Sequence, residues 1–376
     1  MRFTLLENDS ETNARIGRID TDHGHIDTPT FMPVGTVGSV KAVEPRELLE
    51  DIHTQIILGN TYHLYLRPGT ALLEKAGGLH RFMAWPRPIL SDSGGYQVFS
   101  LAHRRKLSEE GVEFQSHIDG SYHTFTPESV VDIQRSIGSD IMMVLDECPA
   151  ADVSADYART SNDLTMRWAA RCKKRFEETG GLFGHHQALF AIVQGVVYPD
   201  VRRESAQRLV DMEFPGYAIG GLSVGESDEQ MYEMVEVVAE YLPTAKPRYL
   251  MGVGTPANLI ENVARGIDMF DCVMPTRNGR NGMLFTTEGI INIKNAKWTA
   301  DLSPIDPGLD TYVSKTFTKA YVRHLFIARE ILGLQIASLQ NLALYSWLMR
   351  EARCAIEERR FAAWRAETGP RMSRRL

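Results

Sequence analysis

Two aspartates with apolar neighbours are the residues best placed to do chemistry. Asp271 lies inside the apolar run 269–275, and Asp92 directly follows the apolar run 88–91. A carboxylate inside a buried strand is costly unless it has a partner, so we favour a functional role for Asp271. Two carboxyl groups can share a displacement at a glycosidic carbon, one attacking while the other transfers a proton. Asp271 and Asp92 are the natural pair for that reaction.

Other polar residues and glycines also end apolar runs. In 91–97, Asp92 is followed by two glycines, which let the backbone approach a ligand, and then by Tyr96. Asp146 ends the run 141–147, Gln194 ends 189–195, and glycines end 217–223. Each feature alone has a structural explanation, because aspartates commonly cap helices and glycines allow close packing.

The apolar runs themselves predict the fold. Eight short β-rich runs alternate with segments of helical apolar spacing, several of which begin with Pro in the first turn. Eight such units favour a closed (β/α)8 TIM barrel over an open sheet, and barrel active sites lie at the carboxyl ends of the strands. The runs are 31–35, 55–60, 88–94, 141–147, 189–195, 217–223, 248–254 and 269–275. The residues expected to converge at their ends are Asn60, Asp92, Asp146, Gln194, Gly221 and Asp271.

The pattern changes after the eighth run. A short β-like stretch (283–293) precedes a Pro- and Asp-rich loop (301–310) and helical segments. We therefore expect a catalytic barrel over residues 1–300, an appended subdomain over 301–344, and a C-terminal helix over 345–376 that packs back on the barrel.

Composition narrows the function classes. The chain has 376 residues, 43% of them hydrophobic, which is enough for a full globular core. Its net charge of −7 argues against indiscriminate coating of nucleic acid, although basic residues cluster locally. The four cysteines lack the spacing of a disulfide framework or a Cys-based zinc cluster. No signal-like N-terminus or apolar run of membrane-spanning length is visible, so we expect a cytoplasmic protein without membrane contact.

These strings, in this order, closely resemble the tRNA-guanine transglycosylase family of bacterial type. The resemblance covers nearly the whole chain. It is carried by the segments above together with 31–36 (FMPVGT), 59–64 (GNTYHL), 67–69 (RPG) and 249–254 (YLMGVG).

The resemblance implies a reaction and a role for each site residue. Asp271 would be the nucleophile that displaces guanine from the ribose at the wobble position 34 of tRNA, forming a covalent RNA–enzyme intermediate, and Asp92 the general base or acid. The base would be read by Asp146, Gln194 and the backbone of Gly221 and Leu222. Tyr96 and Met251 would sandwich it, as an extruded base requires. The chemistry needs no nucleotide cofactor.

The resemblance also implies the substrates and partners. Cys148 and Val224 match the bacterial pattern at the positions that differ in members using the larger base queuine, so we expect the 7-deazaguanine preQ1. Arg277 and Arg280 look like contacts to the anticodon loop, around the U-G-U of G-U-N anticodons. A homodimer is expected, and the pathway would be queuosine biosynthesis.

One feature departs from the family. Its members hold a structural zinc after the barrel with three cysteines and a histidine, whereas the corresponding positions here are Leu309, Thr311, Ser314 and Gln340. Leucine has no donor atom, and hydroxyls and amides are poor zinc ligands. We therefore expect no metal, and a subdomain held by apolar packing of residues such as Leu309, Phe317, Leu325 and Leu339.

Three alternatives stay open. The chain could be a non-catalytic subunit of a transglycosylase, although it retains Asp92 and Asp271. It could act with queuine, on DNA or on another tRNA position, as relatives of the family do. It could be a barrel enzyme of small-molecule metabolism, although 252–254 (GVG) is a weak phosphate-binding signal.

Overall fold

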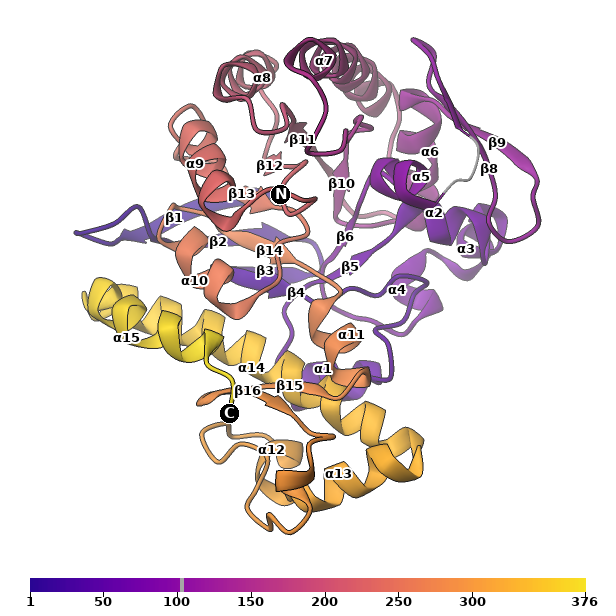
Figure 1. Ribbon diagram of the computed structural model, residues 1–376. Coiled ribbons are helices and arrows are strands. Elements are labelled where there is room, and N and C mark those ends of the chain that lie inside the picture. The colour runs from indigo at the N-terminus through magenta and orange to yellow at the C-terminus, as the bar shows by residue number, and fades with distance from the viewer. Residues whose placement is uncertain (102–104) are drawn as a thin grey trace.

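The computed structural model describes residues 1–101 and 105–376 and contains an eight-stranded parallel barrel (Figure 1). Its strands hydrogen-bond in the order β4-β14-β13-β12-β11-β10-β6-β5, and a parallel bridge between Val34 and Leu58 joins the two end strands. The predicted (β/α)8 barrel is confirmed, and each predicted run overlaps one strand. The strands are β4 (Thr30–Met32), β5 (Ile57–Gly59), β6 (Ile89–Ser91), β10 (Ile141–Met143), β11 (Ala188–Val193), β12 (Tyr217–Ile219), β13 (Arg248–Leu250) and β14 (Met269–Asp271).

The barrel forms because its strands are apolar on both faces. All residues of β10 and β11 are buried, as expected where side chains fill the interior and helices cover the outside. Side-chain caps start several of the covering helices, at Thr126, Ser154, Ser227 and Thr255. These helices are α6 (Pro127–Ile137), α7 (Ala155–Glu178), α9 (Asp228–Ala239) and α10 (Pro256–Val263), and α8 (Pro199–Asp211) lies between α7 and α9 in the chain.

Two small antiparallel sheets lie outside the barrel and were not predicted. The first, β1 (Arg2–Asn8), β2 (Arg15–Thr21) and β3 (Gly24–Thr28), is tied to the barrel by the buried pair of Arg15 and Asp268, at the amino end of β14. The second is β7 (Arg105–Leu107), β8 (Val112–Gln115) and β9 (Tyr122–Phe125). Its loop residue His117 hydrogen-bonds the Tyr62 hydroxyl at 2.8 Å, which places this sheet beside α2 (Thr61–Leu66).

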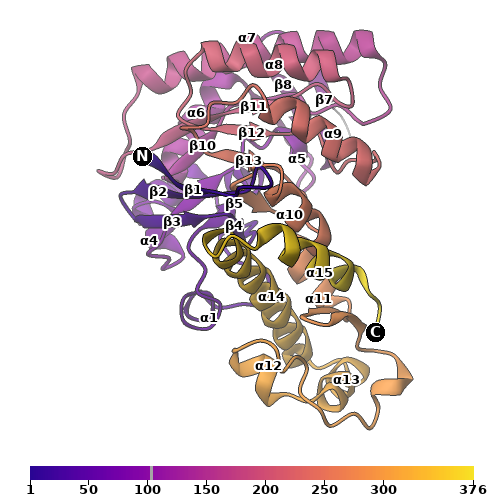
Figure 2. The same ribbon diagram turned by 90° about the vertical axis from the view of Figure 1, so that its left-hand side faces the viewer.

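The chain after the barrel folds around one long helix. Helix α14 (Ile331–Glu357) passes from the subdomain, which contains α12 (Tyr312–Thr316) and α13 (Lys319–Ala328), back to the barrel (Figure 2). There it packs on β4 and on α11 (Met274–Arg280), the helix that follows the eighth strand. Asn341 of α14 donates to the carbonyls of Pro275 and Met283. The hairpin β15 (Met283–Thr286) and β16 (Gly289–Asn292) is thereby joined to α11, which is next to the barrel mouth.

The C-terminal segments complete the packing. Helix α14 continues without a break across residues 344 and 345, the boundary expected between the subdomain and the C-terminal helix. Helix α15 (Phe361–Ser373) packs on α10. Leu309, Leu325 and Leu339 are buried in the subdomain and Phe317 is half-buried. No helix of the described residues combines the length and the apolar character needed to cross a bilayer.

Candidate active site

The carboxyl ends of the barrel strands surround a cavity of about 380 Å³. All site residues predicted from the sequence line this cavity except Arg280. Arg277, on α11, is exposed at its edge, and the half-buried Arg280 lies three residues further along the same helix. The predicted residues that line the cavity are Asn60, Asp92, Tyr96, Asp146, Cys148, Gln194, Gly221, Leu222, Val224, Met251, Asp271 and Arg277.

Asp271 is held through one carboxylate oxygen. It ends β14, and its Oδ1 accepts from the Tyr249 hydroxyl at 2.6 Å and from the Gly252 backbone N–H at 2.9 Å. Within the described residues, Oδ2 has no hydrogen-bond donor. Burial raises the pKa of Asp271, while those two donors act in the opposite direction. A carboxylate with one oxygen fixed and the other unengaged is suited to attack a bound electrophile.

Asp92 is held through both oxygens. It is 7% exposed and lies in the turn between β6 and α5 (Gly95–Leu101). The backbone N–H groups of Thr61 and Gly94 donate to Oδ1 at 2.8 and 3.2 Å, and the side-chain amides of Asn60 and Gln97 donate to Oδ2 at 2.5 and 2.8 Å. This cage fixes the carboxyl group and keeps the charged form accessible inside the barrel mouth.

The charge of Asp271 acts on Asp92. Burial raises the pKa of Asp92 to about 6, its hydrogen bonds oppose that rise, and the negative charge of Asp271 adds to it. A carboxyl group that titrates near pH 6 can both accept and return a proton at neutral pH. Asp92 is therefore suited to proton transfer, whereas Asp271 keeps one oxygen free.

Asp146 and Gln194 form a second polar group in the cavity. Asp146 accepts from Gln194 Nε2 at 2.6 Å and from the Ser93 hydroxyl at 3.0 Å, and burial raises the pKa of Asp146 to about 6. In the part of the chain that the structure describes, the buried Oε1 atom of Gln194 has no hydrogen-bond partner. A buried acceptor with no partner is costly, and a ligand with N–H groups along one edge would satisfy it.

The loop after β12 supplies backbone groups. Glu226 accepts hydrogen bonds from the backbone N–H groups of Ser223 and Val224, the latter at 3.0 Å. Because a trans peptide directs its carbonyl opposite to its N–H, the Leu222 carbonyl points away from Glu226. Leu222 and Ser223 both line the cavity, so this wall can present an acceptor to a ligand.

Aromatic and sulfur-containing side chains complete the lining. Tyr96 is 53% exposed and Met251 is half-buried, so both leave surface for a flat ligand to contact. Burial raises the pKa of Cys148 to about 12, which keeps this thiol protonated at neutral pH.

The cavity residues that were not predicted from the sequence include His63, Gln97 and Tyr249. Tyr249 had a usable signal, because it lies two residues before Met251 and strand residues two apart face the same side. Gln97 lies in the first turn of α5, within reach of the strand end at Asp92. His63 follows Asn60 by three residues on α2, and burial lowers its pKa, so the ring is neutral at pH 7.

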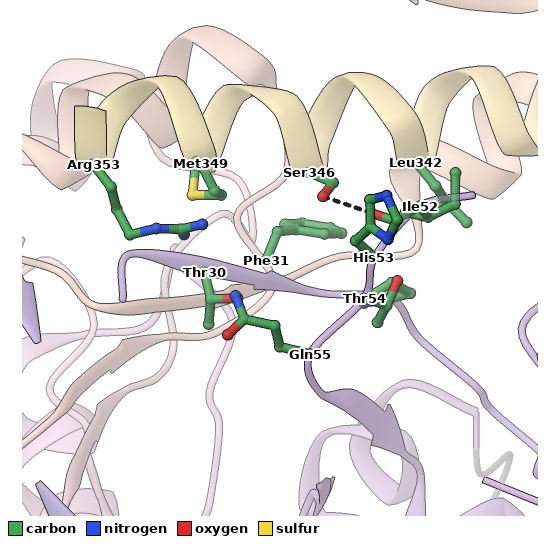
Figure 3. A pocket seen from close by; sticks show the side chains of 11 residues that line it. Thr30, Phe31, Ile52, His53, Thr54, Gln55, Leu342, Ser346, Met349 and Arg353 are labelled. Atoms are coloured by element: carbon green, nitrogen blue, oxygen red, sulfur yellow. Dashed lines mark hydrogen bonds between the residues drawn. The ribbon is translucent and has the colours of Figure 1, made fainter. Parts of the chain in front are cut away.

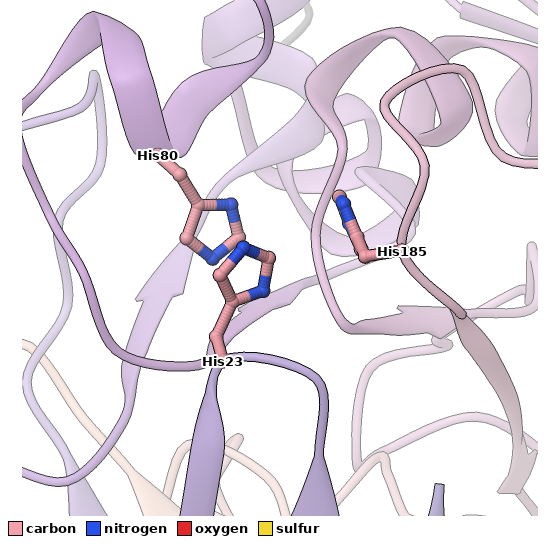
Figure 4. A group of neighbouring side chains, drawn as sticks. All are labelled: His23, His80 and His185. Carbon is pink, nitrogen blue, oxygen red and sulfur yellow. The ribbon is translucent and has the colours of Figure 1, made fainter.

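Three histidines gather at the opposite, amino end of the strands (Figure 4). The buried Asp140 accepts from His23 Nδ1 at 2.7 Å and from His80 Nε2 at 3.2 Å, while His185 contacts the Gly138 carbonyl at 3.0 Å. The His23 and His80 rings stack, with centroids 3.7 Å apart and planes 15° apart. Imidazole lone pairs lie in the ring plane, so two parallel rings do not aim them at one ion. The cluster instead compensates a buried carboxylate.

A small cavity between β4 and α14 is also remote from the chemistry (Figure 3). Its volume is about 20 Å³, and Ser346 spans it with a 2.8 Å hydrogen bond to the Ile52 carbonyl. This space suits roughly one water molecule. The cavity at the strand ends is thus the candidate site.

Comparisons with known proteins agree on the family. The family model described as "Queuine tRNA-ribosyltransferase" matches residues 9–373. Curated proteins named queuine tRNA-ribosyltransferase are similar over nearly the full length of both chains. One from a Thermoanaerobacter species is 54% identical over 98% of this chain and 96% of its own. One from Solidesulfovibrio magneticus is 55% identical over 97% of this chain and 96% of its own length. One from Halothermothrix orenii is 52% identical over the same shares of the two chains.

The raised pKa values predict how stability depends on pH. A carboxyl group with a pKa of about 6 when folded binds a proton more tightly in the folded chain than in the unfolded one. It stabilises the fold below the unfolded pKa, and that stabilisation is lost as the pH rises through about 6. Between pH 7.5 and 4.5, wild-type protein should gain about 2 kcal/mol of unfolding free energy relative to Asp92→Asn, measured by urea denaturation.

Asp200→Asn is the control for this measurement. The side-chain hydrogen bond with Arg159 lowers the pKa of Asp200. The difference in unfolding free energy between the wild type and this variant should therefore shrink, not grow, as the pH falls. A wild-type advantage over Asp92→Asn that does not change with pH would contradict the assignment for Asp92.

Proposed function

The chain belongs to the queuine tRNA-ribosyltransferase family and is a tRNA-guanine transglycosylase of queuosine synthesis, and from this premise we propose its substrates and its mechanism. It exchanges guanine at wobble position 34 of tRNAs with G-U-N anticodons for preQ1, by double displacement through a covalent Asp271–ribose intermediate. The observation that carries this proposal is the shared cavity of Asp271 and Asp92, in which, among the described residues, only Asp271 has an unengaged carboxylate oxygen.

The two displacements divide the work between the carboxyl groups. Asp271 Oδ2 attacks the ribose C1′ atom, and the bond from C1′ to guanine N9 breaks with its electron pair going to the base, which then takes a proton from Asp92. The incoming preQ1 returns a proton to Asp92, attacks C1′ and releases the Asp271 carboxylate. The pKa of Asp92, about 6, suits both proton transfers at neutral pH.

The cavity walls offer partners for each part of the base. Asp146 and the unpartnered Gln194 Oε1 suit the N–H groups on the edge of guanine. Tyr96 and Met251 offer surfaces for its two faces. The Leu222 carbonyl suits the aminomethyl group that distinguishes preQ1 from guanine. This set supports a 7-deazaguanine substrate.

The lining residues near Leu222 support preQ1 over queuine. Cys148 and Val224 both line the cavity on this side. The cyclopentenediol group of queuine adds bulk to the aminomethyl group, and a packed wall excludes such bulk. We therefore retain preQ1 as the proposed substrate.

The tRNA anticodon loop would bind across the mouth of the cavity. Arg277 is exposed at the edge of the cavity, and the half-buried Arg280 lies three residues further along α11, which supports contacts of this helix with phosphates or bases of the loop. We also propose that the protein acts on tRNA in the cytoplasm.

The subdomain is proposed to bind no zinc. The positions that correspond to the family's ligands lie together, but their polar atoms are engaged with each other. The Thr311 and Ser314 hydroxyls are 2.5 Å apart, and Ser314 donates to Gln340 Oε1 at 2.7 Å. Gln340 in turn donates to the Phe285 carbonyl at 3.0 Å, and Leu309 is buried without a donor atom. These residues do not fit a tetrahedral zinc site.

A homodimer is proposed through the subdomain. Large apolar side chains are exposed along α12, α13 and the start of α14, and the rings of Tyr312, Phe317 and Tyr321 contact one another. A monomer gains nothing from exposing such a patch, whereas a second copy would cover it. The exposed side chains include Tyr312, Tyr321, Ile327, Ile331 and Leu332.

The exchange activity is tested with labelled guanine. Wild-type protein should incorporate it into an unmodified tRNA with a G-U-N anticodon, and preQ1 should displace it faster than queuine. Asp271→Asn should reduce the rate by about 10⁴-fold or more, because the nucleophile is lost. Asp132→Asn removes a carboxyl group on α6 that pairs with Arg175, outside the cavity, and should leave the rate unchanged. Wild-type exchange rates in Asp271→Asn, or faster exchange with queuine, would refute the respective part of the proposal.

Metal analysis tests the zinc proposal. Pure, untagged protein should contain far less than one zinc per chain, and a chelator should leave its thermal unfolding unchanged, because hydrogen bonds replace the metal. Gln340→Ala should lower the unfolding free energy by about 1–3 kcal/mol, since it removes a hydrogen-bond partner of the Phe285 carbonyl and of the Ser314 hydroxyl. Stoichiometric zinc that a chelator removes with loss of stability would overturn the proposal.

Sedimentation tests the dimer. Ile331→Lys should weaken self-association by about tenfold or more, because it places a charge in the apolar patch that the second copy would bury. Leu182→Lys changes an equally apolar side chain, 55% exposed, between α7 and β11, and should not affect association. A wild-type monomer at micromolar concentration, or equal effects of both variants, would exclude this interface.

A further inference from the structure

Arg202 of α8 is a buried cation directly behind the cavity wall. Its side chain is fully buried, and its Nε donates to the Val196 carbonyl at 2.7 Å. Its Nη2 donates to two consecutive carbonyls, those of Gly220 and Gly221, at 3.0 and 3.1 Å. Burial lowers the pKa of Arg202 to about 10, so the guanidinium is still charged at neutral pH.

This arrangement is expensive for a purely structural role. No carboxylate of the described residues forms an ion pair with Arg202, although the charge of Glu226 acts on it from a greater distance, and its Nη1 atom is buried without a partner. A buried charge without an ion pair and with an unsatisfied donor destabilises a fold, and an apolar side chain of similar length would avoid that cost. The backbone groups that the guanidinium binds therefore indicate its role.

The two carbonyls determine where the neighbouring N–H groups point. In a trans peptide the N–H is directed opposite to the carbonyl, so the N–H groups of Gly221 and Leu222 point away from Arg202. That is the side of the cavity. Gly221 and Leu222 both line this cavity, together with Cys148.

Glycine is required for this close approach. Gly221 has a φ of 63°, and a Cβ atom there would lie 2.3 Å from Gln194 Oε1. A Cβ atom on Gly220 would lie 2.7 Å from Gln194 Nε2. The loop can thus follow the cavity wall closely only with both glycines, and Arg202 fixes the orientation of the peptides that follow them.

We infer that Arg202 is a positioning residue for the base: it orients the Gly221 and Leu222 N–H groups toward the 6-oxo oxygen of the purine and supports the negative charge that the purine acquires as it leaves. This inference rests on the proposed function. When the bond from C1′ to N9 breaks, the electron pair that N9 receives is delocalised in part to that oxygen. Two peptide dipoles lie between the guanidinium and the oxygen, aligned to stabilise that charge without reorganising.

Arg135 provides a matched control. It is also buried, at 6% exposure, and donates to the Phe176 and Thr179 carbonyls at 2.8 and 2.7 Å. Its contacts lie between α6 and the end of α7, outside the cavity. A variant at this position reports the effect of losing a buried, carbonyl-binding arginine without disturbing the base.

The test compares a base with the 6-oxo group and one without it; the second base, 2-aminopurine, also lacks the N1–H, a difference that is the same for every variant. Dissociation constants of guanine and of 2-aminopurine, which lacks the 6-oxo group, are measured by calorimetry for the wild type, Arg202→Met, Arg202→Lys and Arg135→Met. Arg202→Met should weaken guanine binding by about 30-fold and leave 2-aminopurine within about twofold. In the exchange assay it should lower kcat and raise KM for the base but not for tRNA. Arg202→Lys, which keeps a charge and a donor, should recover part of the loss, and Arg135→Met should show none of it.

The outcomes separate this inference from the proposed function. Equal losses for guanine and 2-aminopurine, or the same losses in Arg135→Met, would show a structural role for Arg202 and overturn the inference. If wild-type protein fails to exchange guanine in tRNA, the proposed function fails, and the binding measurements still decide whether Arg202 orients the base. Should Arg202→Met not fold, Arg202→Lys alone decides through its selectivity between the two bases.

Discussion

The burial of carboxyl groups at the barrel mouth is the constraint on which the rest of the site depends. A carboxylate removed from water must be compensated by donors, and those donors connect strand ends that are distant in sequence. The cage of Asp92 joins the loop after β5 to the loop after β6, and Asp146 joins the ends of β6, β10 and β11 through Ser93 and Gln194. Asp271 joins the ends of β13 and β14. The cavity lies between these hydrogen-bonded groups.

The same constraint assigns different tasks to similar side chains. Full compensation leaves Asp92 fixed with a pKa of about 6, which suits proton transfer, whereas partial compensation leaves one Asp271 oxygen unengaged, which suits attack. Charged side chains also bind backbone groups of the loop after β12. Arg202 engages carbonyls of the loop after β12 and Glu226 engages its N–H groups, so a flexible glycine-containing segment has a defined set of donors and acceptors. Pre-organised polar groups of this kind are what a charge-separating reaction requires.

The barrel was predictable because its strands are buried on both faces and read as continuous apolar runs, as in 188–193. The two small sheets were not, because strands such as Arg2–Asn8 are half-exposed and carry charged residues that resemble a loop. Asp92, Asp146, Gln194 and Asp271 could be placed in one cavity because barrel topology brings strand ends together. Arg202 could not be assigned in that way. It lies on α8, and its contacts with the carbonyls of Gly220 and Gly221 form between elements, so spacing along the chain does not reveal them.

The most direct measurement is the identity of the residue that becomes bonded to RNA. Wild-type protein is mixed with unmodified tRNA of a G-U-N anticodon without added base, denatured in detergent, digested with protease and nuclease, and analysed by mass spectrometry. The account predicts a nucleotide adduct on the peptide that contains Asp271, formed with release of guanine and lost when preQ1 is added before denaturation. An adduct on Asp92, or exchange that proceeds with no adduct on any residue, would contradict it.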